Sequence, residues 1–401
     1  MSDIVLGNIG QLITNNPSRG GVLGEMANVA VAITDGRIAW IGADDELPDE
    51  YSNLPVSDTR GNAVVPGFID AHTHAVFAGD RAHEHAMRLG GATYAEIQAA
   101  GGGIYSTVRA TRDASVRDLV LSGHARLQRM LKSGTTTIEI KTGYGLDVAN
   151  EIKMLDVIDA LDSSVDVDIV RTFLGAHVVA PEFAVDRQGY VDLVAGDMLE
   201  AVRDRVSFVD VFCDDVAFSV TETEQITAAA GAAGLGVRLH VDQTSHSGGS
   251  GLAARVGAIA ADHLDHATEE DLSALAQAQT VAVLLPTVSM MMREPYPDAR
   301  RFIDAGITVA IATDCNPGTS NVETMPFVIA LAAASCGMTP GEALWSATAG
   351  GAAALGLEDR GVLAPGMLAD MVILDAPTFE HLAYRPDANL IARVVKRGRL
   401  V

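Results

Sequence analysis

Cysteine, long apolar runs and basic residues are all scarce in this chain, and each scarcity narrows what the protein can be. The three cysteines share no motif and are odd in number, which argues against a disulfide framework. The longest apolar stretch, residues 327–338, is shorter than the about 20 residues that a membrane-spanning helix needs. The N-terminus lacks a basic segment followed by an apolar one, the pattern of a signal peptide. We therefore expect a soluble, cytoplasmic protein with reduced thiols.

The shortage of positive charge also restricts the partners. The chain has 28 Lys and Arg residues against 52 Asp and Glu residues, a formal net charge of −24. Such a field repels nucleic-acid phosphates and anionic lipid surfaces, so neither nucleic acid nor a membrane is an expected partner. Hydrophobic residues make up 48% of the 401 residues, enough to bury a sizeable core, which excludes an intrinsically disordered protein.

The two ends of the chain share short apolar runs separated by turn residues, a texture typical of β-structure. Near the N-terminus, Asp35-Gly36 separates the runs 29–34 and 37–42 and favours a two-residue hairpin turn. Near the C-terminus, residues 396–399 form a second polar turn. Pairing of both ends into one small β-domain is a hypothesis at this point.

Between the ends, short apolar runs alternate with amphipathic helical patterns such as 116–134 and 149–161. Eight runs with helical crossovers over about 300 residues indicate a (β/α)8 barrel. A doubly wound open sheet is the alternative, but no GxGxxG or P-loop pattern follows an early strand, so we prefer the barrel. The eight runs are 63–71, 135–141, 167–174, 206–212, 236–241, 257–263, 280–285 and 307–313.

The longest connection follows the first run and contains the triplet Gly101-Gly102-Gly103. A glycine triplet can cradle a phosphate, but no GK[ST] follows this one and no strand directly precedes it. We therefore expect a turn or a mobile lid here rather than a phosphate site.

Polar side chains stand at the carboxyl ends of four runs, where a barrel places its active site. His72 and His74 flank one residue, and because side chains along a strand alternate, both project to one face. His240 ends the fifth run, Asp262-His263 ends the sixth, and Asp314 follows the eighth. Imidazoles joined by a carboxylate are ligands typical of zinc or non-haem iron, so these ends predict a metal site.

The remaining histidines have less favourable positions. His83 and His85 repeat the His-x-His spacing, but we expect a loop of solvated charges around them. The others are expected on the surface or behind the site; they are His124, His246, His266 and His381. Cys315 follows Asp314 and should point the opposite way, into packing.

The segment VVPGFIDAHTH, together with His240, His263 and Asp314, resembles the amidohydrolase superfamily. Within it, the whole chain is similar to the imidazolonepropionases, ring-opening enzymes of histidine degradation. The segments that carry this likeness are 72–81, 90–112, 140–146, 173–183, 239–249, 261–266, 284–292 and 312–320. Residues 81–86 depart from the pattern, since relatives more often carry an aromatic residue and a second acid there, which puts the local lid packing in doubt.

The resemblance implies an α/β fold, a distorted (β/α)8 TIM-type barrel with a small β-sandwich domain formed by both chain ends. On the present sequence the β-domain would comprise residues 1–63 and 364–401, and the barrel residues 64–363. Such enzymes act on a small-molecule substrate, and a homodimer is the expected assembly.

By matching motifs, His72, His74, His240 and Asp314 would hold one metal ion per subunit, zinc or iron. Some relatives bind two metals through a carboxylated lysine on strand four. The fourth run here has no lysine, which argues for a mononuclear site. Lys141 ends the second run instead and is interpreted as structural or electrostatic.

The implied reaction is hydrolysis of the ring amide C–N bond of 4-imidazolone-5-propanoate to N-formimidoyl-L-glutamate. Asp314 would move the proton from the attacking water to the departing nitrogen, and His263 would polarise the carbonyl or orient the water. Arg81 and Tyr144 would bind the substrate carboxylate. The full set of implied substrate contacts is Arg81, Tyr144, His177, Gln243, Asn316, Gly318 and Thr319.

Two rivals stay open at this stage. A cyclic deaminase on the same barrel uses a Glu three residues after the strand-five histidine, but this chain has Gln243 there, which cannot transfer a proton at neutral pH. A non-catalytic barrel acting as a binding protein is the other, although such relatives usually lose metal ligands and this chain lacks none.

Overall fold

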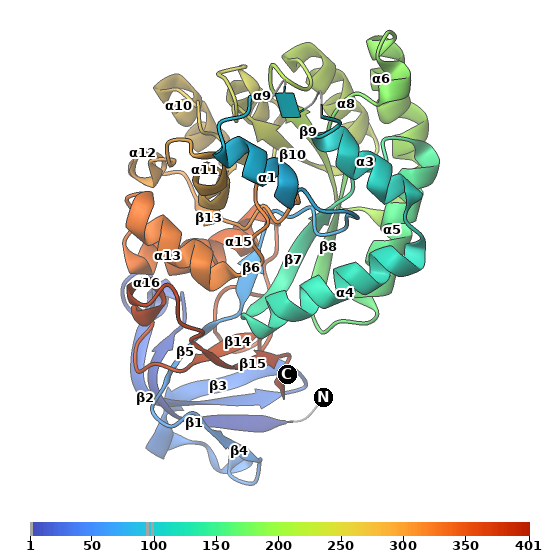
Figure 1. Cartoon of the computed structure of the whole chain (residues 1–401). Helices are drawn as coiled ribbons and strands as arrows, with labels where there is room; N and C mark the ends of the chain where they lie inside the picture. Colours follow the sequence, from blue (N-terminus) through green and yellow to red (C-terminus); the bar gives the residue numbers. More distant parts are fainter. Residues whose placement is uncertain (1–2, 94–95, 98–99) are drawn as a thin grey trace.

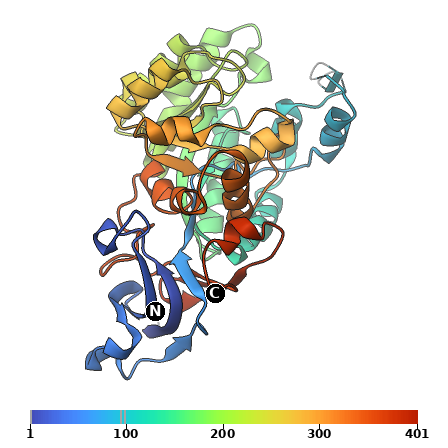
Figure 2. The same cartoon turned by 90° about the vertical axis from the view of Figure 1, so that its left-hand side faces the viewer.

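The chain folds into a large α/β unit with a smaller β-unit beneath it in the view of Figure 1. The structure is a computed structural model that describes residues 3–93, 96–97 and 100–401. Four residues of the motif 90–112 lie outside these ranges. Both chain ends lie in the smaller unit, as the side view of Figure 2 also shows.

Eight parallel strands make up the sheet of the larger unit, and they neighbour one another in chain order. Parallel neighbours need crossover connections, which the intervening helices provide. The predicted barrel-type α/β fold is confirmed, and each of the eight predicted runs contributes a strand. The strands are β6 (Phe68–Asp70), β7 (Thr135–Lys141), β8 (Asp168–Ala176), β9 (Phe208–Cys213), β10 (Gly236–Val241), β11 (Ala260–His263), β12 (Val281–Leu284) and β13 (Val309–Ile311).

The barrel closes through main-chain bonds beyond the ends of β6 and β13 rather than through a regular ladder. Asp314 N donates to His72 O at 3.1 Å, and His74 N donates to Cys315 O at 3.0 Å. Thr73 and Cys315 form an isolated parallel bridge. The seam of the barrel therefore runs through the predicted metal ligands and brings Asp314 beside the two histidines.

The first predicted strand, 63–71, is wrong as one element. It divides at Gly67 into β5 (Ala63–Pro66), which belongs to the small unit, and β6, which belongs to the barrel. A Cβ on Gly67 would lie 2.3 Å from Thr136 Oγ1, so only glycine allows the chain to cross so close to β7. Apolar periodicity continues across both pieces, which is why the division was not visible in the sequence.

Strands from both chain ends build the second domain, as predicted, and pair in one mixed sheet. The antiparallel pairing of β5 with β14 joins the two ends of the chain. The domain limits 1–63, 64–363 and 364–401 stay a prediction. The remaining strands of this sheet are β1 (Ile4–Ile13), β2 (Glu25–Thr34), β3 (Arg37–Ala43), β4 (Val56–Asp58), β14 (Met371–Leu374), β15 (Ile391–Lys396) and β16 (Arg399–Leu400).

Both predicted hairpin turns are present. Asp35 (φ 51°) and Gly36 (φ 75°) join β2 to β3, and Arg397 (φ 47°) and Gly398 (φ 74°) join β15 to β16. Two successive positive φ angles characterise the type I′ turn, whose twist matches that of the flanking strands.

Helices cover the outside of the barrel (Figure 1). The two predicted amphipathic segments are helices α4 and α5, which begin at the side-chain caps Ser115 and Asp147. The α-helices are α1 (Ala82–Leu89), α3 (Ile104–Asp113), α4 (Val116–Lys132), α5 (Val148–Asp162), α6 (Arg187–Leu193), α7 (Leu199–Val202), α8 (Val220–Ala232), α9 (Gly249–Val256), α10 (Glu269–Ala278), α11 (Pro286–Met292), α12 (Ala299–Asp304), α13 (Met325–Ser335), α14 (Pro340–Ser346), α15 (Ala349–Ala354) and α16 (His381–Tyr384).

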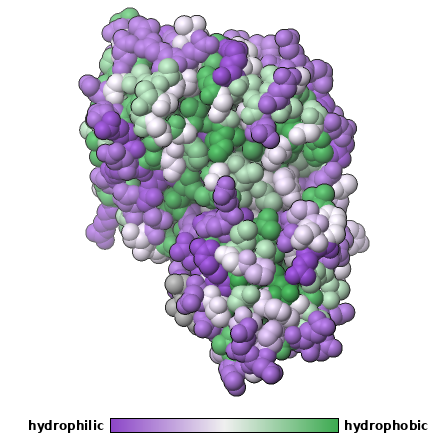
Figure 3. Space-filling model, turned by 180° about the vertical axis from the view of Figure 1, so that it is seen from behind, coloured by the Kyte–Doolittle hydropathy of each residue, from purple (hydrophilic) through white to green (hydrophobic). Residues whose placement is uncertain are grey.

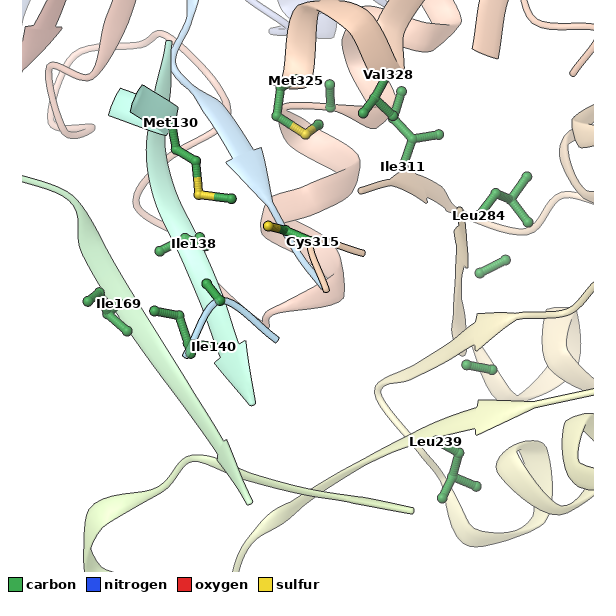
Figure 4. Close-up of a cluster of buried hydrophobic side chains, with 14 of the residues drawn as sticks. Met130, Ile138, Ile140, Ile169, Leu239, Leu284, Ile311, Cys315, Met325 and Val328 are labelled. Carbon is green, nitrogen blue, oxygen red and sulfur yellow. The ribbon is translucent and has the colours of Figure 1, made fainter. Parts of the chain in front are cut away.

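The barrel strands and the helices around them share a continuous apolar core, part of which is shown in Figure 4. Cys315 is fully buried and lies in this core with Met130, Ile138 and Met325. The prediction that Cys315 packs rather than points into the site is therefore confirmed.

On the face shown in Figure 3, hydrophilic side chains lie mainly around the edges, and hydrophobic ones gather toward the middle and near the junction of the two units. No helix among the described residues is both long and apolar enough to cross a membrane.

The burial of the cysteines predicts that the native protein resists thiol reagents. Burial raises the pKa of Cys213 to about 11 and that of Cys336 to about 12, and Cys315 is likewise shifted upward by burial, so little reactive thiolate forms near neutral pH. We expect Ellman's reagent to release almost no chromophore from native protein and three equivalents from protein unfolded in guanidinium. Rapid release of one or more equivalents from the native protein would contradict this packing.

Candidate active site

A pocket of about 340 Å³ opens at the end of the barrel that faces away from the small unit. Because β6 enters directly from the small sheet, this is the end at which the strands finish. Of the predicted site residues, His72 lies fully buried beneath the pocket and Gly318 packs behind Arg81. The others line it: His74, Arg81, Tyr144, His177, His240, Gln243, His263, Asp314, Asn316 and Thr319.

Three imidazoles and one carboxylate converge on the floor of this pocket. Asp314 Oδ1 lies 3.4 Å from His72 Nε2 and 3.5 Å from His74 Nε2. His240 Nε2 lies 3.4 Å from His74 Nε2. Each of the four side chains is at most 4% exposed. The structure thus brings the four predicted ligands together although they come from three separate parts of the chain.

The donor set fits a metal ion. His72 Nε2 and Asp314 Oδ1 are buried and have no hydrogen-bond partner among the described residues, an arrangement that is costly unless something else satisfies them. Burial lowers the pKa of His72 and of His74 well below the usual value, so both rings are neutral and can offer lone pairs. Lone pairs that face each other repel, and a cation among them removes the repulsion. Imidazole nitrogen with carboxylate oxygen suits zinc or iron.

Two buried carboxylates set the orientation of the histidine rings. His72 Nδ1 lies 2.7 Å from Asp262 Oδ2, and His240 Nδ1 lies 3.0 Å from Asp210 Oδ2. A carboxylate can only accept, so each Nδ1 carries the proton and each Nε2 presents its lone pair to the pocket. This is the arrangement in which metal-binding histidines are usually supported.

A lysine and an arginine hold these carboxylates from below. Lys141 Nζ lies 2.7 Å from both Glu139 Oε1 and Asp210 Oδ2, and Arg238 Nη2 lies 3.0 Å from Asp262 Oδ2. All of these side chains are fully buried. Burial by itself lowers the pKa of Lys141, but the Asp210 and Glu139 carboxylates outweigh it and the pKa is raised. These ion pairs agree with the structural or electrostatic role expected for Lys141.

Two residues at the site have backbone angles that residues other than glycine rarely adopt. His263 has φ 76° and Asp314 has φ 47°, both in the left-handed region. Asp314 is held there by the bond from its N to His72 O, and the preceding Thr313 is fixed by Asp70, whose Oδ1 accepts from Thr313 N at 3.0 Å. Such strain persists only where the surroundings fix it, and it is frequent at functional sites.

His263 lies beside the four predicted metal ligands, and within the described part of the chain no hydrogen bond fixes its Nδ1. Its ring centroid lies 5.3 Å from that of His240, and its Nδ1 is buried without a hydrogen-bond partner among the described residues. Asp265 Oδ2 is 3.9 Å from this nitrogen, too far for a direct hydrogen bond. Burial lowers the pKa of His263 well below its usual value, so the ring is neutral and can exchange a proton or orient water.

His177 and Tyr144 form the wall next to His74. The His177 ring stacks on that of His74 with centroids 4.9 Å apart, and its Nδ1 donates to Gly143 O at 3.1 Å. Burial, with His240 adding to it, lowers the pKa of His177 to about 3. The ring is therefore neutral over the working range of pH and keeps Nε2 as an acceptor.

Asn316 shapes the loop after β13. Its Oδ1 accepts from Gly318 N and Thr319 N, each at 2.8 Å. Its Nδ2 donates to Asp314 O at 2.8 Å and to Thr319 Oγ1 at 2.9 Å. Every hydrogen-bonding group of the Asn316 side chain is thus engaged within the loop. Gln243 is placed similarly by its main chain, which donates to Asp214 Oδ2 at 3.0 Å.

Arg81 contributes a guanidinium to the lining of the pocket. Its Nε donates to Glu84 Oε2 at 2.8 Å, and each of the two side chains is only 12% exposed. Gly318 lies against it, since a Cβ on that residue would stand 2.1 Å from Arg81 Nη1. The expectation of a loop of solvated charge around His83 and His85 is wrong: these residues lie in α1, and Glu84 is buried.

Four buried charged residues at the site were missed in the sequence: Glu139, Asp210 and Arg238 beneath the ligands, and Glu84 beside Arg81. Three of them are charged residues inside apolar strands, a signal that could have identified them. Glu84 gave no such signal, because a short charged helix normally faces solvent. His246, by contrast, pairs with Asp271 and its side chain is 48% exposed, as expected for a surface histidine.

Replacing Lys141 should expose the cost of the buried charges. Lys141→Met leaves Glu139 and Asp210 without their shared cation, so we expect the free energy of unfolding in urea to fall by about 3–5 kcal/mol. Lys132→Met at the exposed end of α4 is the matched control and should change it by no more than about 0.5 kcal/mol. Equal effects of the two substitutions would show that Lys141 does not compensate these carboxylates.

Comparison of the sequence with known proteins identifies the family of this chain. The family model of the amidohydrolase family matches residues 63–401. An imidazolonepropionase of Cutibacterium acnes is 49% identical over 99% of this chain and 97% of its own length. Imidazolonepropionases of Salinispora tropica and Streptomyces coelicolor are each 47% identical over 99% of this chain and 98% of their own.

Solved structures with the same fold are more distant in sequence. A triazine hydrolase variant superposes with a TM-score of 0.76 at 19% identity, covering 99% of this chain and 94% of that chain. Guanine deaminase from C. acetobutylicum gives 0.72 at 17% identity over 100% of both chains. These likenesses support the fold, whereas the family model and the sequence relatives define membership: the chain belongs to the amidohydrolase family and, within it, to the imidazolonepropionases.

Proposed function

We propose that this protein hydrolyses the ring amide C–N bond of 4-imidazolone-5-propanoate to give N-formimidoyl-L-glutamate, a step of L-histidine degradation. The observation that carries the proposal is the convergence of His72, His74, His240 and Asp314 at a pocket that Arg81 also lines. The imidazoles and the carboxylate suit hydrolysis, and the guanidinium suits a carboxylate of the substrate. The names of the relatives agree with this substrate.

We propose one metal ion per subunit, zinc or iron, held by His72, His74, His240 and Asp314. Such an ion acts as a Lewis acid and lowers the pKa of water to about 7. Some relatives bind a second metal through a lysine on the fourth barrel strand. The fourth strand here, β9, contains no lysine, which supports a single ion. The chain is expected to act in the cytoplasm as a homodimer.

Substrate binding is assigned to Arg81, Gln243 and the pocket wall next to His74. Arg81 offers a planar pair of donors to the propanoate carboxylate, with the Tyr144 hydroxyl beside it. His177 presents Nε2 as an acceptor toward the ring, and Gln243 offers a neutral amide that can hydrogen-bond a ring nitrogen or oxygen. Asn316 holds the loop that carries Gly318 and Thr319, the remaining proposed substrate contacts.

The proton transfers are assigned to Asp314 and His263. The Asp314 carboxylate accepts a proton from the water that attacks the ring carbonyl, and a C–O bond forms. His263 polarises the carbonyl oxygen or holds the water in line. Asp314 then delivers the proton to the ring nitrogen as the C–N bond breaks, so that the products are a formamidine nitrogen and a carboxylate.

The first test is the reaction itself. Because imidazolone-propanoate is unstable, urocanase would generate it from urocanate in the cuvette, and its ultraviolet absorbance would be followed after addition of metal-loaded protein. We expect accelerated decay with N-formimidoyl-glutamate as the product, and loss of the acceleration with a chelator. No acceleration by protein with verified metal content would direct the search to other cyclic amides and amidines.

Replacement of Asp314 should affect both metal and turnover. For Asp314→Ala we expect weaker metal binding, measured by metal analysis after dialysis, and a fall in kcat of about 10²–10⁴-fold because the proton acceptor is gone. Near-normal kcat at full metal occupancy would remove Asp314 from this role.

Replacement of Arg81 should act on binding. Arg81→Met removes charge-assisted bonds to the substrate carboxylate, so kcat/KM should fall about 10–100-fold, mainly through KM. Arg117→Met, at an exposed position on α4, is the control and should leave kcat/KM unchanged. An unchanged kcat/KM in Arg81→Met would place the carboxylate elsewhere.

A further inference from the structure

The glycine triplet 101–103 holds a buried carboxylate of the chain itself. Gly103 N donates to Glu84 Oε2 at 3.1 Å, and Ser106 Oγ donates to Glu84 Oε1 at 3.1 Å. A Cβ on Gly102 would lie 2.8 Å from Glu84 Cδ, and Gly103 has φ 82°. Gly102 thus leaves room both for this carboxylate and for Ile97, whose Cγ2 would also lie 2.8 Å from a Cβ there, and Gly103 adopts a backbone conformation that favours glycine.

The same carboxylate is bonded to Arg81. Glu84 Oε2 accepts from Arg81 Nε at 2.8 Å, so the guanidinium is attached by its inner nitrogen. Its outer nitrogens stay at the pocket, where Nη1 lies against Gly318. Glu84 on one side and Gly318 on the other thus restrict Arg81 to one position.

Building on the proposed binding of the substrate carboxylate by Arg81, we propose that Glu84, seated on the glycine triplet, is a positioning residue that makes the pocket selective for an anionic side chain. Glu84 does not touch the substrate. It fixes the plane of the guanidinium, so that the two Nη groups meet both oxygens of a carboxylate at once.

The negative charge of Glu84 distinguishes a positioning role from a direct electrostatic effect on the ligand. A carboxylate beside the binding site repels an anionic ligand, so removal of its charge alone should not weaken binding of an anion. If Glu84 acts through geometry, an isosteric amide should replace it. Gln at this position can accept from Arg81 Nε and Gly103 N with its oxygen. Its NH2 can donate to Ser106 Oγ, whose single proton can then go to Gly103 O, 2.8 Å away, instead of to residue 84.

Helix α3 links Glu84 to the wall of the pocket. Ser106 belongs to α3, and Ile104 at the start of that helix lines the pocket. By bonding to Ser106, Glu84 ties this wall to the residue that binds the carboxylate. Loss of Glu84 should therefore affect the carboxylate end of the pocket and leave the metal end intact.

The test compares two stable ligands, imidazole-4-propanoate and imidazole-4-propanamide, which differ in the charge of the side chain. Binding to the metal-loaded holoenzyme would be measured by calorimetry for wild type, Glu84→Ala, Glu84→Gln, Gly102→Ala and the exposed α1 control His83→Ala. Thermal unfolding and metal content would verify that each variant is folded and loaded.

We expect Glu84→Ala to weaken propanoate binding at least about tenfold, the size of a lost charge-assisted bond, and propanamide binding by less than about threefold. Gly102→Ala should weaken propanoate binding in the same direction as Glu84→Ala, because its Cβ would crowd the Glu84 carboxylate as well as Ile97. Glu84→Gln and His83→Ala should stay within about threefold of wild type for both ligands.

Three results would overturn the proposal: equal losses for both ligands in Glu84→Ala, propanoate binding as tight as in wild type in that variant, or equal losses in Glu84→Gln and Glu84→Ala. Failure of the proposed function is distinguishable. Wild type that turns over imidazolone-propanoate while Glu84→Ala keeps the preference for the propanoate refutes the positioning role alone. Wild type that neither turns over the substrate nor prefers the propanoate refutes both.

Discussion

The site depends on a layer of charges sealed inside the barrel beneath the metal ligands. It contains two cations and three carboxylates, all fully buried: Lys141, Arg238, Glu139, Asp210 and Asp262. Burying ions costs several kcal/mol each, so the layer is a poor way to stabilise a fold. Its effect is geometric, because Asp262 and Asp210 fix His72 and His240 with their Nε2 lone pairs facing one point. With one carboxylate in excess, the layer also favours a cation above it.

The closure of the barrel adds the fourth ligand. A regular ladder between β13 and β6 would continue two extended strands side by side, whereas here the chain bends into the left-handed region at Asp314 and bonds to His72 O. Glu139 joins this seam as well, since its Oε2 accepts from Thr73 N at 3.2 Å. The same carboxylate therefore pairs with Lys141 below and fixes the His-x-His segment above. The same contacts therefore close the barrel and hold the site residues in place.

The parts of this architecture that follow a period could be predicted from the sequence, and the parts that depend on contacts across the barrel could not. The alternation of apolar runs with helical patterns predicts the eight strands. It also predicts that His72, His74 and His240 lie at the carboxyl ends of these strands. The division at Gly67 depends on how closely Thr136 approaches, which no local pattern records. Glu84 is similar: in sequence it belongs to a charged helix, and only the glycine turn, some twenty residues later in the chain, makes its burial possible.

An acidic protein that binds an acidic substrate has to resolve a conflict of charge. The formal net charge of −24 repels an anion at long range, but at physiological ionic strength the Debye length is about 8 Å, so most surface carboxylates have little effect inside the pocket. The Arg81–Glu84 pair is itself neutral, so it offers little long-range attraction to compensate. Preference for a carboxylate must then arise at contact, from directed N–H donors held in a fixed plane. For this reason the geometry of one arginine counts for more here than the sign of the whole surface.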